Sequence, residues 1–221
     1  MLKAIGIGRK VANHWLFRGI SLSLQPGQRL ALLGPSGSGK TLLLRALAML
    51  DTIDAGEIRW HGAIISGNQI PRFRSQVMFL PQQPALPEGT VEQILRQPFS
   101  LRVYQGRQFH RQRIVEWLRS LGRSDTFLAK QHHNLSGGEA QLTALLRSVQ
   151  LDPDILLLDE PTAALDAETV EMVESLVATW LDQKSDQPYT TVWVTHDHEQ
   201  IQRVSNSTLC IRDGLIHPGE M

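Results

Sequence analysis

The stretch Gly34-Pro35-Ser36-Gly37-Ser38-Gly39-Lys40-Thr41 decides the fold of this chain. It fits the pattern G-x-x-x-x-G-K-[ST] of the phosphate-binding P-loop. Leu30 to Leu33 before it form an apolar run typical of a buried strand, and the Leu- and Ala-rich segment from Thr41 to Leu50 after it is typical of a helix. The motif therefore stands in the strand–loop–helix context that a P-loop requires, which argues against a chance match.

The residue types of this loop indicate what it binds. Its glycines allow a tight turn and a close approach of the backbone to oxygen atoms, so successive N–H groups line a concave anion site at a helix N-terminus. Lys40 would reach the β- and γ-phosphates of a nucleotide, and the Thr41 hydroxyl would ligate Mg²⁺. We therefore expect a nucleoside triphosphate and Mg²⁺ as cofactors.

The composition limits the classes of partner. The chain has 221 residues with 22 Lys plus Arg and 22 Asp plus Glu, so there is no overall basic field to attract nucleic acid, and no nucleic-acid partner is expected. A single cysteine, Cys210, is compatible with a reducing cytosol. Apolar windows fall far short of the ~20 residues of a membrane span. We expect a cytoplasmic protein that reaches a membrane through a partner.

The order of patterns along the chain predicts an α/β fold. Residues 2–33 are rich in strand patterns, and His61-Gly62 separates the two halves of a plausible hairpin. Three prolines between residues 81 and 87 interrupt regular structure. From residue 155 onward, strand and helix patterns alternate, as in βαβ units with a mostly parallel sheet.

The segment after the prolines is helical in character. Thr90 with Gln93 and Ser136 with Glu139 both fit capping boxes at helix starts. We therefore expect a single domain of residues 1–221. Its nucleotide-binding core would consist of residues 1–82 and 151–221, with a helical subdomain of residues 83–150 inserted between them.

A second motif supplies acidic residues. Ile155 to Leu158 form an apolar strand that ends at Asp159 and Glu160. Because ligands of open α/β sheets gather at the carboxyl ends of strands, Asp159 could hold Mg²⁺ as a Walker B aspartate. Glu160 could orient or deprotonate an attacking water.

A third motif narrows the family. Leu135-Ser136-Gly137-Gly138-Glu139 places a hydroxyl and exposed N–H groups at a helix start, which makes a second anion-binding surface. A P-loop, this Ser-Gly-Gly signature and a strand ending in Asp-Glu together resemble the ABC ATPase family. The remaining family motifs follow in order, with Gln82 in the Q-loop, Ala164-Leu165-Asp166 as the D-loop and His196 as the switch histidine.

The resemblance implies a fold and a mechanism. It implies a RecA-like P-loop NTPase core with an antiparallel β subdomain and a helical insertion subdomain. It also implies a head-to-tail dimer in which each ATP lies between the P-loop of one subunit and Ser136, Gly137 and Gly138 of the other. Glu160 would be the general base, Gln82 would sense Mg²⁺ and the attacking water, and His196 would contact the γ-phosphate.

Two positions depart from the family pattern. The family places an adenine-stacking aromatic near residue 9, where this chain has Arg9, and Trp15 is a possible substitute. Gln141-Leu142 replaces the usual Gln-Arg pair after the signature, so an arginine is lost. We still expect hydrolysis, because the Walker residues are intact.

The resemblance also implies a setting. We expect the ATP-hydrolysing subunit of an ABC transporter, bound at the inner face of the cell membrane through a separate multi-span permease. The chain is similar to the small ATPase subunit of a bacterial iron-export ABC system. The alternative is an ABC ATPase without transport that acts as a mechanical switch in cell division or repair. If a permease docks beside the Q-loop, the candidate apolar contacts are Leu86, Val91, Ile94 and Leu95.

Overall fold

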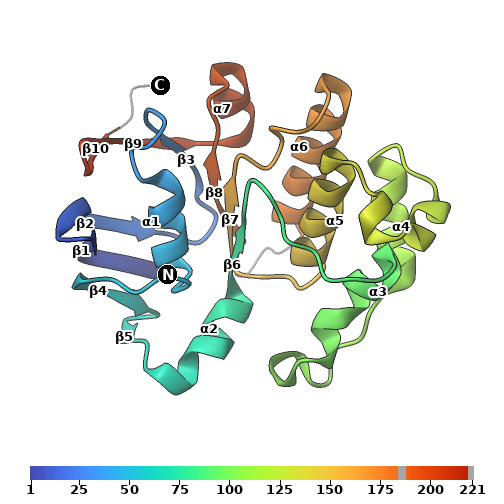
Figure 1. The fold of residues 1–221 in the computed structure, drawn as a ribbon, viewed down its shortest axis with the longest axis horizontal. Coiled ribbons are helices and arrows are strands. Elements are labelled where there is room, and N and C mark those ends of the chain that lie inside the picture. The colour runs from blue at the N-terminus through green and yellow to red at the C-terminus, as the bar shows by residue number, and fades with distance from the viewer. Residues whose placement is uncertain (184–187, 219–221) are drawn as a thin grey trace.

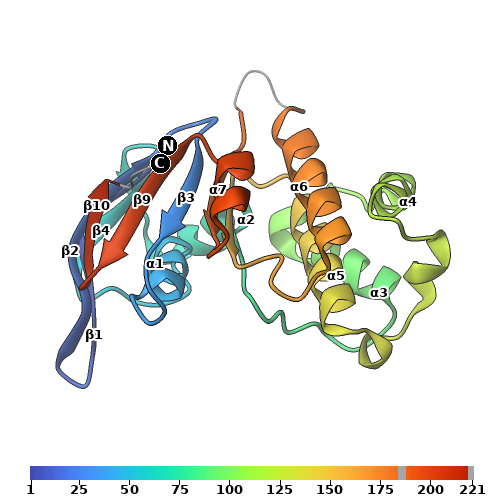
Figure 2. The ribbon, with the colours of Figure 1, turned by 90° about the horizontal axis from the view of Figure 1, so that it is seen from above.

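The computed structural model of the chain describes residues 1–183 and 188–218. Its described part contains a four-stranded antiparallel sheet of order β2-β1-β4-β5 and a six-stranded sheet of order β10-β9-β3-β8-β7-β6. The sheets occupy one half of the molecule in Figures 1 and 2, and the helices α3 to α6 occupy the other. The predicted α/β class is therefore confirmed.

The strands, in chain order, are β1 Leu2–Val11, β2 His14–Leu24, β3 Arg29–Leu33, β4 Ala55–Trp60, β5 Ala63–Ile64, β6 Val77–Leu80, β7 Ile155–Asp159, β8 Thr190–Val194, β9 Ser207–Arg212 and β10 Leu215–Pro218. The α-helices are α1 Lys40–Leu47, α2 Ile70–Gln76, α3 Val91–Arg96, α4 Arg111–Ser120, α5 Gly137–Val149, α6 Ala167–Leu181 and α7 His198–Val204. Short 3₁₀ turns are η1 Gly67–Gln69, η2 Gln97–Ser100, η3 Arg102–Tyr104, η4 Asp125–Ala129 and η5 His132–Asn134.

The six-stranded sheet brings several chain segments to one edge. β6, β7, β8, β3 and β9 run parallel to their neighbours, and β10 closes the sheet by pairing antiparallel with β9. Leu80 lies opposite Leu158, and Leu158 lies opposite Trp193. The residues that follow β6, β7 and β8 therefore emerge side by side, although they are far apart in the sequence.

Strand β7 is buried on both faces and separates two hydrophobic cores. Because successive strand residues point to opposite faces, Leu156 and Leu158 pack with the α5 and α6 side, while Ile155 and Leu157 pack with α1 and the antiparallel sheet. A near-continuous apolar run is the pattern of a central parallel strand. Because β7 is packed on both faces, the positions of Asp159 and Glu160 at its end are fixed.

Helix α1 lies between the two sheets. Its apolar face, from Leu43 to Leu47, packs with residues of both sheets in one core. That core includes Leu2, Ile7 and Phe17 from the antiparallel sheet and Leu30 and Leu32 from β3. The helix that follows the P-loop is thus held on two sides, which gives the loop a rigid support.

The local signals in the sequence are confirmed where they depend on neighbouring residues. Both capping boxes form, at Thr90 with Gln93 and at Ser136 with Glu139. The hairpin at His61-Gly62 forms as β4 and β5. Helix α2 and the extension of β1 and β2 into a long hairpin were not predicted. Within residues 1–183 and 188–218, no helix combines the length and the apolar character that a bilayer span requires.

Candidate active site

The P-loop leaves β3, turns through three glycines with positive φ and enters α1. Gly34, Gly37 and Gly39 have φ of 144°, 79° and 95°. A Cβ on Gly34 would lie 2.3 Å from the carbonyl oxygen of Ile211 on β9, so glycine is required there for packing as well as for conformation. The loop is therefore clamped against the neighbouring strand, with its backbone turned around the start of the helix.

Lys40 bends back over this loop. Its ammonium donates to the carbonyl oxygens of Gly34 at 2.8 Å and Pro35 at 3.0 Å, and the residue is 6% exposed. Burial lowers the pKa of Lys40, while the nearby carboxylates of Glu160 and Asp159 raise it. The cation is thus positioned at the mouth of the loop, where a phosphate group would replace carbonyl oxygens as its partner.

Asp159 and Thr41 meet beside the lysine. The Thr41 hydroxyl donates to the Asp159 carboxylate at 2.7 Å, and Asp159 is 4% exposed. Burial raises the pKa of Asp159, which the Thr41 hydrogen bond partly offsets by lowering it. A hydroxyl and a carboxylate side by side form the hard-oxygen donor set that Mg²⁺ takes, usually together with substrate phosphates and water. The residues present therefore fit this metal.

Glu160 joins residues from three neighbouring strands. Its carboxylate accepts a hydrogen bond from the Gln82 amide at 2.8 Å and lies 2.9 Å from Nε2 of His196. Gln82 follows β6, Glu160 follows β7 and His196 follows β8, so the parallel register of these strands brings the three together. Of the residues expected at Mg²⁺, Gln82 contacts Glu160, whereas Thr41 and Asp159 contact each other.

The Ser-Gly-Gly signature lies elsewhere in the same chain. Ser136 caps α5 by accepting from the Glu139 backbone N–H at 3.2 Å, and the Glu139 carboxylate accepts from the Ser136 N–H at 3.1 Å and pairs with Lys130 at 2.6 Å. Figures 1 and 2 show α5 and the P-loop helix α1 in opposite halves of the molecule. The signature therefore does not contribute to the P-loop site of its own chain in this structure.

The D-loop residue Asp166 lies next to the signature. It caps α6 by accepting from the Thr169 backbone N–H and hydroxyl, both at 2.9 Å, and these hydrogen bonds lower the pKa of its carboxyl. A Cβ on Gly138 would lie 3.0 Å from the carbonyl oxygen of Ala164. The signature helix and the D-loop are thus in close contact, which ties these two motifs together.

The structure engages Arg9 in a way that the sequence did not predict. Its guanidinium donates to the Thr52 hydroxyl at 2.7 Å and pairs with Asp54 at 3.4 Å, so it braces the start of β4. Trp15 lies under two cations, with Lys10 4.4 Å and Arg18 4.8 Å from its ring. Arg9 and Trp15 are thus both engaged by residues of their own chain.

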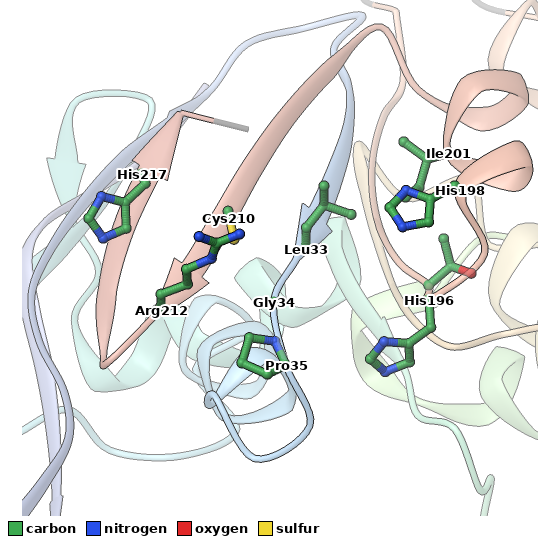
Figure 3. Close-up of a pocket in the computed structure, with 10 residues that line it drawn as sticks. Leu33, Gly34, Pro35, His196, His198, Ile201, Cys210, Arg212 and His217 are labelled. Atoms are coloured by element: carbon green, nitrogen blue, oxygen red, sulfur yellow. The ribbon is translucent and has the colours of Figure 1, made fainter. Parts of the chain in front are cut away.

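A cavity of about 570 Å³ adjoins the P-loop on the side away from β7. Figure 3 shows Arg212 and Cys210 from β9 on one wall, His196 and His198 on the opposite wall, and Gly34 and Pro35 between them. His217 from β10 extends the first wall. Arg212 and His217 could not be predicted from the sequence, because β9 and β10 carry no motif and meet the loop through sheet topology alone.

Comparison with known proteins identifies the family. A family model described as ABC transporter matches residues 17–163, which is more than half of the chain. The probable iron export ATP-binding protein FetA of Escherichia coli (strain K12) is 30% identical over 100% of this chain and 94% of its own length. The sulfate/thiosulfate import ATP-binding protein CysA of Pseudomonas syringae pv. tomato is 37% identical over 91% of this chain. The chain spans 54% to 63% of the length of four curated relatives, CysA among them.

Solved structures agree with this assignment. A dimeric structure of a post-hydrolysis state of the ATP-binding cassette MJ0796, bound to ADP and Pi, superposes with a TM-score of 0.86 at 26% identity, covering 100% of this chain and 98% of the other. The P-loop, the acidic strand end and the signature all lie on that common fold. The chain therefore belongs to the ABC transporter family and carries that family's ATP-hydrolysing cassette.

Proposed function

We propose that the chain binds and hydrolyses ATP to drive transport through a separate membrane permease, to which it is bound at the cytoplasmic face. The observation that carries this proposal is the meeting of Gln82, Glu160 and His196 beside the P-loop lysine. A carboxylate held between an amide and an imidazole is placed to act on a water molecule. The proposal that hydrolysis is coupled to transport rests on membership of the ABC transporter family.

The P-loop would bind the phosphates of ATP, and the acidic end of β7 would bind Mg²⁺ together with Thr41. The backbone N–H groups of residues 34–41 and the Lys40 ammonium would hold the β- and γ-phosphates. Thr41 and Asp159, now 2.7 Å apart, would hold Mg²⁺, with Gln82 reaching it from the Q-loop. Bound Mg²⁺ would neutralise charge that develops on the phosphate oxygens.

Glu160 would act as the general base. Its two carboxylate oxygens are held by different partners, so the group has a fixed orientation toward the P-loop side. Gln82 and His196 would exchange their bonds with Glu160 for bonds to the attacking water and the γ-phosphate. Both groups therefore already lie close to where they would act.

The signature supports a two-chain site. Ser136, Gly137 and Gly138 present a capped helix start that no P-loop of the same chain covers, and related cassettes are dimeric. We propose that a second ATPase subunit, here a second copy of this chain, places its signature and its Asp166 segment over the bound ATP. Each site of such a dimer would then use residues of both chains.

The first prediction concerns Glu160→Gln. The carboxamide keeps the shape but cannot accept the proton, so ATP turnover should fall ~10²–10⁴-fold while ATP binding is kept. Phosphate release assays and calorimetric titration with ATP measure the two properties. Glu171→Gln, an exposed position on α6, is the matched control. A variant that hydrolyses ATP at the wild-type rate would remove Glu160 from the reaction.

The second prediction tests the shared site by complementation. Lys40→Ala disables the P-loop and Ser136→Arg disables the signature, so each variant alone should be inactive. Mixed together, they form heterodimers with one intact site, and activity should return to about a quarter of the wild-type rate for random two-fold pairing. Ser175→Arg, on exposed α6 surface, is the control for the added cation. Full activity of Ser136→Arg on its own would show that one chain completes the site.

A groove between the core and the helical subdomain is the proposed permease site. Val91, Ile94 and Leu95 are buried in the core of the helical part, so the expectation that they contact a permease is wrong, and Leu86 packs partly against the same core. The groove encloses about 230 Å³, with Leu50 and Arg74 on the core side and Leu101 and Tyr104 on the helical side. Leu50 and Leu101 are 41% and 53% exposed, which leaves apolar surface for a partner.

The third prediction is that Leu101→Glu separates hydrolysis from docking. A charge in the groove should abolish co-purification with the proposed permease, while the free subunit keeps its ATPase activity. Val103→Glu is the matched control, because Val103 is also exposed but does not line the groove. Normal co-purification of Leu101→Glu would place the docking surface elsewhere.

Iron export is the proposed transport activity. It is supported by the relative named for iron export, which matches the whole of this chain, although relatives named for sulfate and Fe(3+) import also match.

The fourth prediction is that deleting the gene raises total cell iron in iron-rich medium. The wild-type gene should reverse the rise and Glu160→Gln should not. Lower cell iron in the deletion strain would indicate import and overturn the proposed direction.

A further inference from the structure

The cavity on the far side of the P-loop has an electrostatic character opposite to that of the catalytic side. On the β7 side, Asp159 and Glu160 place two carboxylates next to the loop. The residues that line the cavity, in the part of the chain that the structure describes, include no acidic side chain. They include instead the Arg212 guanidinium and the imidazoles of His196, His198 and His217.

Arg212 is available for a ligand. Among residues 1–183 and 188–218 it has no carboxylate partner, and its side chain is exposed on β9. A guanidinium presents five N–H donors in a fork that matches the oxygens of a phosphate group. Figure 3 shows Arg212 and His217 on the wall that faces His196, so donors from two sides border the same space.

Hydrolysis creates a ligand with the matching chemistry at the edge of this cavity. Gly34 and Pro35 of the P-loop and His196 also line the cavity, so the cavity borders the proposed ATP site. Cleavage of ATP leaves inorganic phosphate, a multiply charged anion, beside the carboxylates of Asp159 and Glu160. Like charges at a few ångströms repel, whereas the described lining of the cavity past His196 includes a guanidinium and no carboxylate.

We propose that the cavity between β9, β10 and α7 binds the inorganic phosphate released by hydrolysis, with Arg212 and His217 as its principal donors. The proposal rests on ATP hydrolysis at the P-loop site and is independent of what the transporter carries. Its volume of about 570 Å³ accommodates a phosphate ion together with water molecules. The phosphate would leave the Asp159 and Glu160 carboxylates sideways, past His196.

The test compares Arg212→Gln with wild type in steady-state ATPase assays containing 0 to ~50 mM inorganic phosphate at constant ionic strength. We expect the phosphate concentration for half inhibition to rise about tenfold in the variant, as for loss of a hydrogen bond to a charged group, with the KM for ATP unchanged. Arg212→Lys should restore part of the inhibition. Arg119→Gln, an exposed arginine on α4, is the matched control, and thermal unfolding confirms that each variant is folded.

A single-turnover experiment then separates product phosphate from phosphate in solution. ATP cleavage is followed by rapid quench and free phosphate by a fluorescent phosphate sensor. We expect release to lag behind cleavage in the wild type and the lag to shorten in Arg212→Gln. Equal inhibition of both proteins overturns the proposal, as does an unchanged lag. Loss of ATP-dependent dimerisation in Arg212→Gln would assign the cavity to the subunit interface and overturn it as well.

Discussion

The burial of β7 on both faces is the constraint on which the site depends. The four apolar residues of β7 pack alternately into two hydrophobic cores. A shift of the strand by one residue would therefore move each side chain into the wrong core. Asp159 and Glu160 come directly after those residues, so the register of β7 also sets the positions of these two carboxylates. The packing that stabilises the centre of the molecule is also what sets a carboxylate 2.7 Å from Thr41 and another 2.8 Å from Gln82.

The site residues that could be predicted are those whose role follows from local chemistry. A P-loop can be predicted because its glycines, lysine and threonine lie close together in the sequence. Both capping boxes can be predicted because each pairs residues only three positions apart. The contacts of Arg9 and the burial of Val91, Ile94 and Leu95 were not predicted, for another reason. Their environments are made by Asp54 and by α5, which lie far away in sequence. Arg212 could not be found at all, because only the pairing of β3 with β9 brings it to the loop.

In the proposed transporter, the link between the nucleotide site and the permease runs through a short polar segment. The buried Gln141 side chain on α5 donates to the Pro81 carbonyl at 3.3 Å, and the next residue, Gln82, reaches Glu160. Helix α5 is therefore connected to the Glu160 carboxylate through Pro81 and Gln82, which are hydrogen-bonded at both ends. In the proposed reaction Gln82 exchanges Glu160 for the nucleotide site. Such an exchange gives the closed state contacts that the open state lacks, which is what a population shift requires.

The arrangement of charges around the P-loop gives the proposed reaction a direction. Lys40 lies at the centre. Its burial lowers its pKa, and the neighbouring carboxylates of Glu160 and Asp159 raise it. Asp159 and Glu160 lie on the β7 side, where the proposed reaction needs Mg²⁺ and the attacking water, and the Arg212 guanidinium lies on the β9 side, where we propose that the product phosphate binds. While γ-phosphate and Mg²⁺ remain together, the acids are balanced by the metal. Once the bond is broken and the phosphate becomes a separate anion, the same acids favour its departure toward Arg212. Sheet order thus separates the two sides, because β7 and β9 flank the β3–β8 pair from opposite directions.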